Sequence, residues 1–516
     1  MSSEPHALAV LGLRPIRTRR DLSPAATEAP ARPDPHEFVW WPYLVLAVVW
    51  LALIPANYVT GRVFRFELSM SLWILANLLY LFSGRGMYQI FLFLVLPSVL
   101  IGVTDFFELG IVTVEMAFLI PALNLIPYTL CRALSRHYPE RHALLRGYRL
   151  SPRLLLFSLA CFMSAFWAAK YPTQALRAIG VFFVIPFFFY LYTSHAIQRL
   201  ANVKQIATVI VSLTAFYSTL MGIIQLFRRG TFAMIARNIV IFREDQQEKM
   251  WLGTYGEGKI ISVWPDSASF GHVLCFSLPL AFGLALLAKT RKARYFHMLA
   301  LLLISTGILI TGNRTDILGA GAAMALFLLG YWGKSATVRG LFVKFALLAS
   351  IAVAVVVTTR ESNGLRRLLM PEEWDKRTAS SRTILMEEGI RMFKSSPLFG
   401  IGLDNFVWNQ NYQQGDIIIV GNYAHNLFIQ ILAETGVVGF AAFLFLLAGI
   451  FRLAPVTWRH RTASEYDFFC FLFLIGSIVM ILQGLVENSI FYLQTAALWW
   501  AGIGIWRGRA LEHAGR

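Results

Sequence analysis

Charged side chains are scarce in this sequence of 516 residues. Asp, Glu, Lys and Arg make up 15% of it and hydrophobic residues 57%, whereas a soluble domain has about 25% charged residues. The apolar residues gather into stretches close to the ~20 residues that an α-helix needs to cross the hydrocarbon layer. These stretches lack the alternation of barrel strands, so the sequence predicts an all-α, polytopic integral membrane protein.

Cysteine and acidic residues are also few. The four cysteines, Cys131, Cys161, Cys275 and Cys470, lie in or beside apolar stretches, which excludes a disulfide framework and favours small core residues. The 29 acidic residues are outnumbered by 46 basic ones, giving a formal charge of +17. Lys and Arg are confined to breaks between apolar stretches and form no basic face. We therefore expect membrane topology, not nucleic acid, to explain the excess.

The apolar stretches predict about 12–14 transmembrane helices. They lie near 43–60, 68–83, 87–104, 111–131, 154–170, 175–193, 206–227, 269–288, 295–312, 315–332, 340–358, 425–450, 467–485 and 489–506. The segment before them is rich in Arg, Pro and Ala and lacks the apolar core of a signal peptide, so we expect a disordered tail there.

The distribution of basic residues predicts the orientation, because basic loops stay in the cytoplasm. With the N-terminal tail inside, the even-numbered connections are basic, as in 132–153 and 289–294. Both termini are then cytoplasmic, in a bacterial inner membrane. The predicted order is a basic cytoplasmic tail (1–42), N-terminal transmembrane helices (43–227), a periplasmic loop (228–268), central transmembrane helices (269–358), a large periplasmic loop (359–424), C-terminal transmembrane helices (425–506) and a cytoplasmic tail (507–516).

The two long outer loops are where we look for a site, because loops on a rigid scaffold carry most binding groups. The larger loop contains a helical pattern over 381–393, which we expect to lie along the membrane surface with its apolar side down. The segment 396–403 ends that helix in a turn.

Arg314 lies at the outer junction of two apolar stretches, in Thr311-Gly312-Asn313-Arg314-Thr315-Asp316. A guanidinium at that depth is costly without a partner and usually marks a substrate path. Its planar fork suits a phosphate or diphosphate. The alternatives are an ion pair with Asp316 and snorkelling at a helix end.

His425 and Asn426 open the helix that follows the larger loop. Gly436 and Gly439 fall within about 40° of the histidine's stripe at ~100° per residue. We therefore expect this face to pack closely against another helix while His425 stands at the outer end. A histidine is the natural general base near neutral pH, although many histidines at helix ends are structural.

These residues resemble a known family. His425-Asn426, nine intervening residues, Gly436, two residues and Gly439 are similar to the histidine motif of the O-antigen ligase and bacterial polysaccharide polymerase superfamily. The run that begins at Arg382 and includes Gly389 and 397–406 resembles the segment before that motif. Arg314 matches the family's membrane-embedded arginine. The resemblance covers about residues 250–445.

The resemblance implies a metal-independent glycosyltransferase without a cofactor, with a fold like that of the C-type glycosyltransferases. The donor would be a glycan on undecaprenyl diphosphate, and the acceptor lipid A–core or another glycan. Arg314 and Arg382 would hold the diphosphate, and His425 would activate or orient the acceptor hydroxyl. Cations can replace a divalent metal at such a leaving group, and the outer loops contain no Asp-x-Asp motif or His/Cys ligand cluster.

Four further positions belong to this prediction. Lys259 stands where the family usually has an arginine, so it keeps the charge without the fork; a solvated loop lysine is the alternative. Asp266 is either a helix cap, which we favour, or an acceptor contact. Asn426 is expected to position donor or acceptor, and His272 to be structural. Aromatic residues of the outer loops either stack on sugars or form an interfacial belt: Trp251, Tyr255, Trp264, Trp408, Tyr412 and Tyr423.

Three readings of the function stay open. The segment 262–271 is slightly more similar to polymerases of exported polysaccharides than to ligases. A transporter of lipid-linked oligosaccharide needs charges through the whole bilayer, whereas the candidates here gather at one face, with Lys170, Glu115 and Glu487 the residues to check. A scaffold of an export complex would leave Arg314 and His425 unexplained. Expected partners are the lipid bilayer, the two glycan substrates and other export proteins.

Overall fold

The structure of this chain is a computed structural model. It describes residues 88, 91–100, 106–109, 112–115, 124–126, 128–130, 150–196, 200–227, 260–262, 264, 266–331, 373–410, 413–414, 417–418, 423–488 and 490–514. The predicted tail over 1–42, the predicted helices near 43–60, 68–83 and 340–358, and Lys259 lie outside the described residues.

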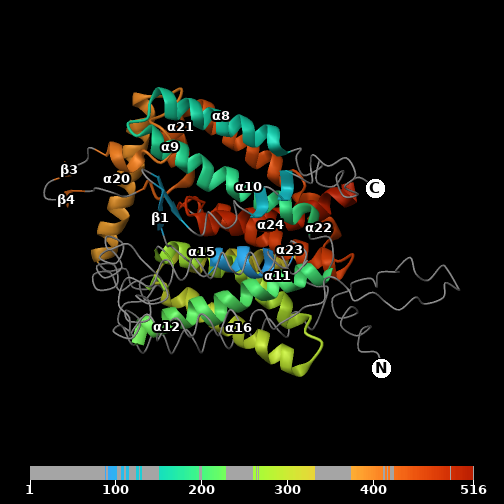
Figure 1. The fold of residues 1–516 in the computed structure, drawn as a ribbon. Helices are drawn as coiled ribbons and strands as arrows, with labels where there is room; N and C mark the ends of the chain where they lie inside the picture. Colours follow the sequence, from blue (N-terminus) through green and yellow to red (C-terminus); the bar gives the residue numbers. More distant parts are fainter. Residues whose placement is uncertain are drawn as a thin grey trace.

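The described residues are mostly helical (Figure 1). The helices of the first half are η3 (Phe91–Val95), α5 (Leu96–Leu100), α8 (Ser151–Trp167), α9 (Pro172–Ile179), η5 (Gly180–Val184), α10 (Ile185–Ala196), α11 (Leu200–Ser212), η6 (Leu213–Thr219) and α12 (Leu220–Phe227). Those of the second half are α15 (Ser267–Leu286), α16 (Arg291–Ile310), α17 (Arg314–Tyr331), α20 (Glu373–Ser395), η7 (Phe406–Asn409), α21 (Leu427–Phe451), α22 (Ala454–His460), α23 (Glu465–Gln483) and α24 (Leu493–Ala514).

Among the described residues, six helical spans are long and apolar enough to cross a membrane, in agreement with the predicted all-α, multi-pass architecture. They are Pro172–Ser194, Leu200–Phe227, Ser267–Leu286, Arg291–Ile310, Leu427–His460 and Glu465–Gln483. Each overlaps a predicted stretch, although Leu200–Phe227 begins six residues before the predicted 206–227 and Leu427–His460 ends ten residues after the predicted 425–450. Hydrophobic length and charged breaks therefore identify this part of the fold.

Two short hairpins interrupt the helical pattern. Strands β1 (Phe106–Leu109) and β2 (Val112–Glu115) pair antiparallel, as do β3 (Gln413–Gln414) and β4 (Ile417–Ile418). The prediction of a helix from residue 111 is therefore wrong over 112–115. Val and Thr in that segment favour strand, and hydropathy alone does not separate a short apolar strand from the first turn of a helix.

Helix α15 lies at the centre of the bundle, and every one of its residues is buried. It packs against α11, α16, α17 and α23. Close approach depends on small residues: the ring of Phe276 occupies the space that a Cβ atom would need at Gly476 of α23 and at Gly502 of α24. Glycines at helix contacts serve the same purpose in many membrane bundles.

Polar residues cap the helices where the sequence leaves an apolar stretch. Asp266 accepts a hydrogen bond from the backbone of Ser269 at 2.6 Å, and Thr290 from Ala293 at 3.1 Å. Ser464 accepts one from Asp467 at 3.1 Å. Such caps satisfy backbone donors that have no partner within the helix.

Helix α21 is broken at Gly436, whose φ of 64° and ψ of −169° are not helical. The segment 397–402 enters the break: Val437 donates to the Pro397 carbonyl at 2.8 Å, and Gly402 donates to the Glu434 carbonyl at 2.9 Å. A Cβ atom at Gly436 would overlap the backbone of Leu398. Irregular backbone is tolerated at membrane depth where protein buries it in this way.

The prediction that Gly436 packs against another helix is therefore wrong. It meets the 397–399 segment, and the break interrupts the angular period along α21. Gly439 lies beyond the break, where a Cβ atom would overlap the side chain of Thr435 in the same helix. The 3.6-residue helical period of the sequence assumes an unbroken helix, so it cannot predict a break at a residue with positive φ such as Gly436.

Helix α20 lies across one end of the bundle, opposite the end that holds the C-terminus (Figure 1). Its apolar side packs against α21 and the preceding loop, where Leu385 and Met392 join a small core with Ile401, Phe406 and Ala433. The predicted contact of this apolar side with the membrane surface is therefore wrong: protein covers it.

Candidate functional site

Four helix ends meet at the end of the bundle covered by α20. The Asp316 side chain, in the first turn of α17, fills the space beside Gly271 near the start of α15. Its Oδ1 atom accepts a hydrogen bond from Gln483, the last residue of α23, at 3.4 Å. The next residue, Gly484, accepts one from Leu427 at the start of α21, at 2.8 Å. The N-termini of α15, α17 and α21 thus converge, and their dipoles favour an anion.

Glu487 joins two of the predicted site residues. It lies in the turn between α23 and α24 and is buried. Its Oε1 atom forms an ion pair with the guanidinium of Arg382 on α20, and its Oε2 atom lies 2.8 Å from Nδ1 of His425. Arg382 and His425, 43 positions apart in the sequence by their numbers, therefore meet on one carboxylate.

The charge on Glu487 determines which nitrogen of His425 holds a proton. Burial by itself raises the pKa of Glu487, but His425, Arg382 and His272 outweigh it and lower the pKa from 4.5 to about 2. The carboxylate is therefore ionised at neutral pH and can only accept hydrogen bonds, so Nδ1 of His425 is the donor of this pair. In the neutral imidazole, Nε2 is then left as a proton acceptor.

The backbone around His425 is held in an uncommon conformation. His425 has a φ of 49°, in the left-handed region that few residues other than glycine adopt. The preceding residue, Ala424, donates a hydrogen bond to Gln430 at 3.2 Å, and Asn488 donates to the same Gln430 oxygen at 2.6 Å. The strained residue is thus fixed from both sides, as is common at functional sites.

Arg314 is the first residue of α17 and is partly buried. The helix begins there because Gly312, with a φ of 72°, turns the chain and the Asn313 side chain accepts a hydrogen bond from Thr315 at 3.3 Å. Arg314 therefore stands at the end of the bundle where Asp316 accepts a hydrogen bond from Gln483. Gln483 is the last residue of α23 and precedes Glu487 by four positions.

Asn426 and Asp266 both act as helix caps. The Asn426 side chain accepts hydrogen bonds from Phe428 and Ile429, both at 3.0 Å, and donates one to the Leu485 carbonyl at 2.7 Å. Asp266 caps α15, as the favoured reading predicts, and its carboxylate also interacts with the hydroxyl of Tyr492. Both caps therefore contact the turn that contains Glu487.

A second acidic group contacts the segment that leads to His425. Asp404, which also has a positive φ, accepts a hydrogen bond from the Tyr423 hydroxyl at 3.1 Å. Burial, only partly offset by Tyr423 and Arg177, raises the pKa of Asp404 from 3.8 to about 6. Tyr423 is thus engaged with Asp404, two residues before His425.

The structure also shows the surroundings of three other predicted positions. His272 is fully buried in α15, six residues after Asp266, and neither ring nitrogen has a hydrogen-bond partner within the part of the chain that the structure describes. Trp264 is fully buried, so the reading that it stacks on a sugar is wrong. Trp408 is half exposed beside Tyr171, with ring centroids 5.2 Å apart, and stays available for that role.

The neighbours of Lys259 indicate where that segment is attached. Ile261 and Ser262 donate backbone hydrogen bonds to the Gln225 side chain of α12, at 3.1 and 2.8 Å. The residues directly after Lys259 are therefore anchored at the C-terminal end of α12, five positions before the α15 cap.

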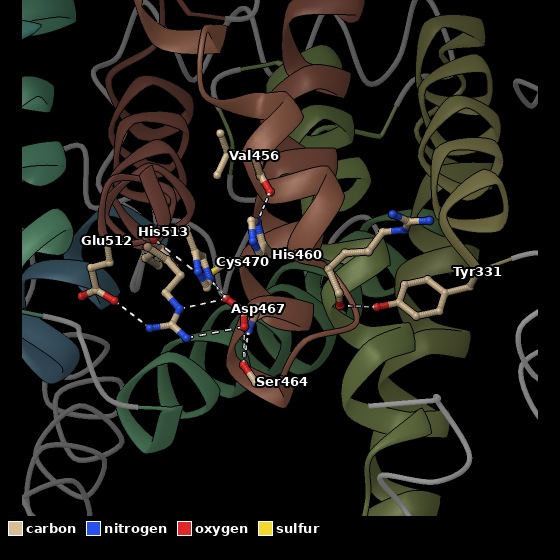
Figure 2. A network of polar contacts seen from close by, with 11 residues as sticks. Tyr331, Val456, His460, Ser464, Asp467, Cys470, Glu512 and His513 are labelled. Carbon is tan, nitrogen blue, oxygen red and sulfur yellow. Dashed lines mark hydrogen bonds and ion pairs between the residues drawn. The ribbon is translucent and has the colours of Figure 1, made fainter. Parts of the chain in front are cut away.

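Figure 2 shows a second polar cluster. It includes residues near the C-terminal end of α24, at the end of the bundle away from α20 (Figure 1). Asp467 at the start of α23 pairs with Arg509 at 2.8 Å and with His513 at 2.7 Å, both on α24. The ring of His460 from α22 stacks on His513 with centroids 4.1 Å apart. These contacts join three helix ends with one another, and the acidic group is fully engaged by them.

Residues 299–444 match the family model described as O-antigen ligase. This match supports membership of the O-antigen ligase family. No curated protein matches the chain. Membership in turn supports glycan transfer of the O-antigen ligase or polymerase type, with a lipid-linked glycan and an acceptor as substrates.

The matched region contains Arg314, Arg382, His425 and Asn426 but ends before Glu487. Glu487 was not among the predicted site residues. A carboxylate between two apolar helices was its only sequence signal, and that signal does not identify its partners.

Proposed function

We propose that this protein transfers a glycan from an undecaprenyl-diphosphate carrier to a sugar hydroxyl at the periplasmic face of the inner membrane, without a metal ion. The acceptor we favour is a growing glycan, which makes the protein a polymerase of a cell-surface polysaccharide. The family match supports glycan transfer in general. The choice of donor and acceptor rests on the resemblance described above.

The observation that carries this proposal is the meeting of Arg382 and His425 on Glu487. A glycan transferase that uses a diphosphate leaving group needs cations at the diphosphate and a base at the attacking hydroxyl. The pair offers one of each, and Arg314 adds a second cation at the same end of the bundle.

The reaction then follows from these groups. The acceptor oxygen attacks the anomeric carbon of the donor glycan while its proton passes to Nε2 of His425. The bond from that carbon to the diphosphate breaks, and the electron pair leaves with the diphosphate. Arg314 and Arg382 neutralise the negative charge that develops there, which is the largest single contribution in many transfer enzymes.

Complementation tests the function in the cell. Arg314→Ala and His425→Ala are expressed separately in a strain that lacks the native gene, and lipid-linked and surface glycans are analysed. A polymerase defect leaves undecaprenyl-linked single repeats. Lipid-linked polymer beside bare lipid A–core indicates a ligase and overturns the favoured acceptor. Normal surface glycan with both variants contradicts the mechanism.

A further inference from the structure

We propose that Glu487 is a shared counter-ion of the site, which orients His425 through one oxygen and competes through the other with the donor's diphosphate for Arg382. This inference rests on the proposed function. It assigns a positioning role to a residue outside the region that matches the O-antigen ligase family.

The two oxygens of Glu487 have separate partners. Oε1 pairs with Arg382, and Oε2 pairs with Nδ1 of His425. The Glu487 side chain is 8% exposed, whereas Arg382 and His425 are 28% and 32% exposed. The carboxylate thus lies beneath two groups that both keep an accessible side, so a ligand can reach Arg382 and His425 without contacting Glu487.

The turn that contains Glu487 is fixed against the start of α21. Gly484 and Leu485 accept hydrogen bonds from Leu427 and Asn426, at 2.8 and 2.7 Å. Asn488 donates to Gln430 at 2.6 Å on the other side of Glu487. Since the same helix start holds His425, the carboxylate and the imidazole are parts of one rigid unit, which is what orienting a base requires.

Arg382 belongs to a different unit. It lies on α20, which packs on α21 through side chains such as Leu385 and Met392. A long arginine side chain can leave one anion for another without movement of its helix. A diphosphate carries more negative charge than one carboxylate and accepts bidentate hydrogen bonds from a guanidinium, so we expect it to take Arg382 from Glu487.

Two effects follow when the donor binds. The exchange reduces donor affinity, because the Arg382–Glu487 pair must first separate. After the exchange, the negative charge of Glu487 interacts with His425 and no longer with Arg382. This favours proton transfer from the acceptor hydroxyl to Nε2 of His425, because the carboxylate stabilises the imidazolium that forms.

The test compares Glu487→Gln with wild-type protein, using purified full-length chains. Glutamine keeps the shape but loses the charge. We expect kcat for glycan transfer to fall about 10- to 100-fold, within the range that a general base contributes. We also expect farnesyl diphosphate, a water-soluble polyprenyl diphosphate, to bind about fivefold more tightly, because its competitor for Arg382 is weakened. A purely structural lesion would lower both kcat and affinity.

A double-mutant cycle asks whether Glu487 acts through His425. In the His425→Ala background, Glu487→Gln is expected to change kcat less than twofold, whereas independent effects would multiply. Glu487→Asp, which keeps the charge, is expected to recover part of the lost rate. Glu388→Gln is the matched control: Glu388 is a buried carboxylate of α20 that pairs with Arg391.

The results that overturn the inference differ from those that overturn the proposed function. Wild-type kcat in Glu487→Gln, a full multiplicative loss in the His425→Ala background, or weaker binding of farnesyl diphosphate each contradicts the shared counter-ion. If wild-type protein transfers no glycan, the proposed function fails instead; if His425→Ala by itself transfers glycan at the wild-type rate, the catalytic role of His425 fails. Should Glu487→Gln not fold, Glu487→Asp in the two backgrounds decides the same question.

Discussion

The break in α21 gives a sharp prediction for Gly436→Ala. Gly436 has a φ of 64° and a ψ of −169°, a conformation that essentially only glycine adopts, so a side chain there costs about 1–3 kcal/mol by itself. The new Cβ atom would also overlap the backbone of Leu398 and push the 397–399 segment away. Val437 and Val438 would then lose their acceptors on Pro397 and Leu398, at about 0.5–1.5 kcal/mol each. We expect a total loss of about 2–6 kcal/mol.

Thermal unfolding of detergent-solubilised protein, followed by size-exclusion chromatography, measures this loss. The matched control is Gly321→Ala in α17, where a Cβ atom meets nothing within 4 Å. At that helical position alanine is favoured over glycine by about 1 kcal/mol. Gly436→Ala should therefore unfold at a clearly lower temperature than wild type, and Gly321→Ala should not. Equal unfolding temperatures for the two variants would refute the account of the broken helix.

Three further predictions concern the site. Asn426→Ala and Thr290→Ala each remove a helix cap and should each lower the free energy of unfolding by about 1 kcal/mol. Only Asn426→Ala should slow glycan transfer, because Thr290 lies at the other end of the bundle. Equal activity of the two variants contradicts the placement of the site. The raised pKa of Asp404 means that its contribution to stability is complete below about pH 4 and is lost as pH rises through about 6. The stability lost in this way is at most about 3 kcal/mol. The unfolding temperature of Asp404→Asn should therefore depend less on pH between 4 and 7 than that of wild type. An unchanged pH dependence would show that another group is responsible. Transfer by wild-type protein should continue in EDTA, because the proposed reaction uses cationic side chains in place of a metal ion; loss of activity that magnesium restores would contradict a metal-independent reaction.

Hydrophobic length predicted most of the helices in the described part of the chain, because a bilayer imposes one length on every span. The cap Asp266 was also predicted from sequence, since short polar residues before apolar runs satisfy free backbone donors. Asn426 was expected to position a substrate, and its role as a cap was missed. The break at Gly436 was not accessible. It depends on a segment more than thirty residues earlier in the chain that supplies the hydrogen bonds that the helix loses there.

The candidate site was predictable only where its residues belong to a local sequence motif. Arg382 and His425 were identified by a motif, and the structure brings them together. Glu487 follows a different helix, 62 positions after His425 by their numbers, so no local spacing joins the two. The apolar side of α20 was assigned to the membrane because Leu385 and Met392 have the same periodicity whether lipid or protein covers them.

A structure determined with bound undecaprenyl diphosphate tests the central claim most directly. The account predicts the diphosphate at the end of the bundle beneath α20, with hydrogen bonds from Arg314 and Arg382, and Arg382 no longer paired with Glu487. A diphosphate held instead by Arg509 and its neighbours at the opposite end, or bound without contact to Arg314 and Arg382, would contradict it.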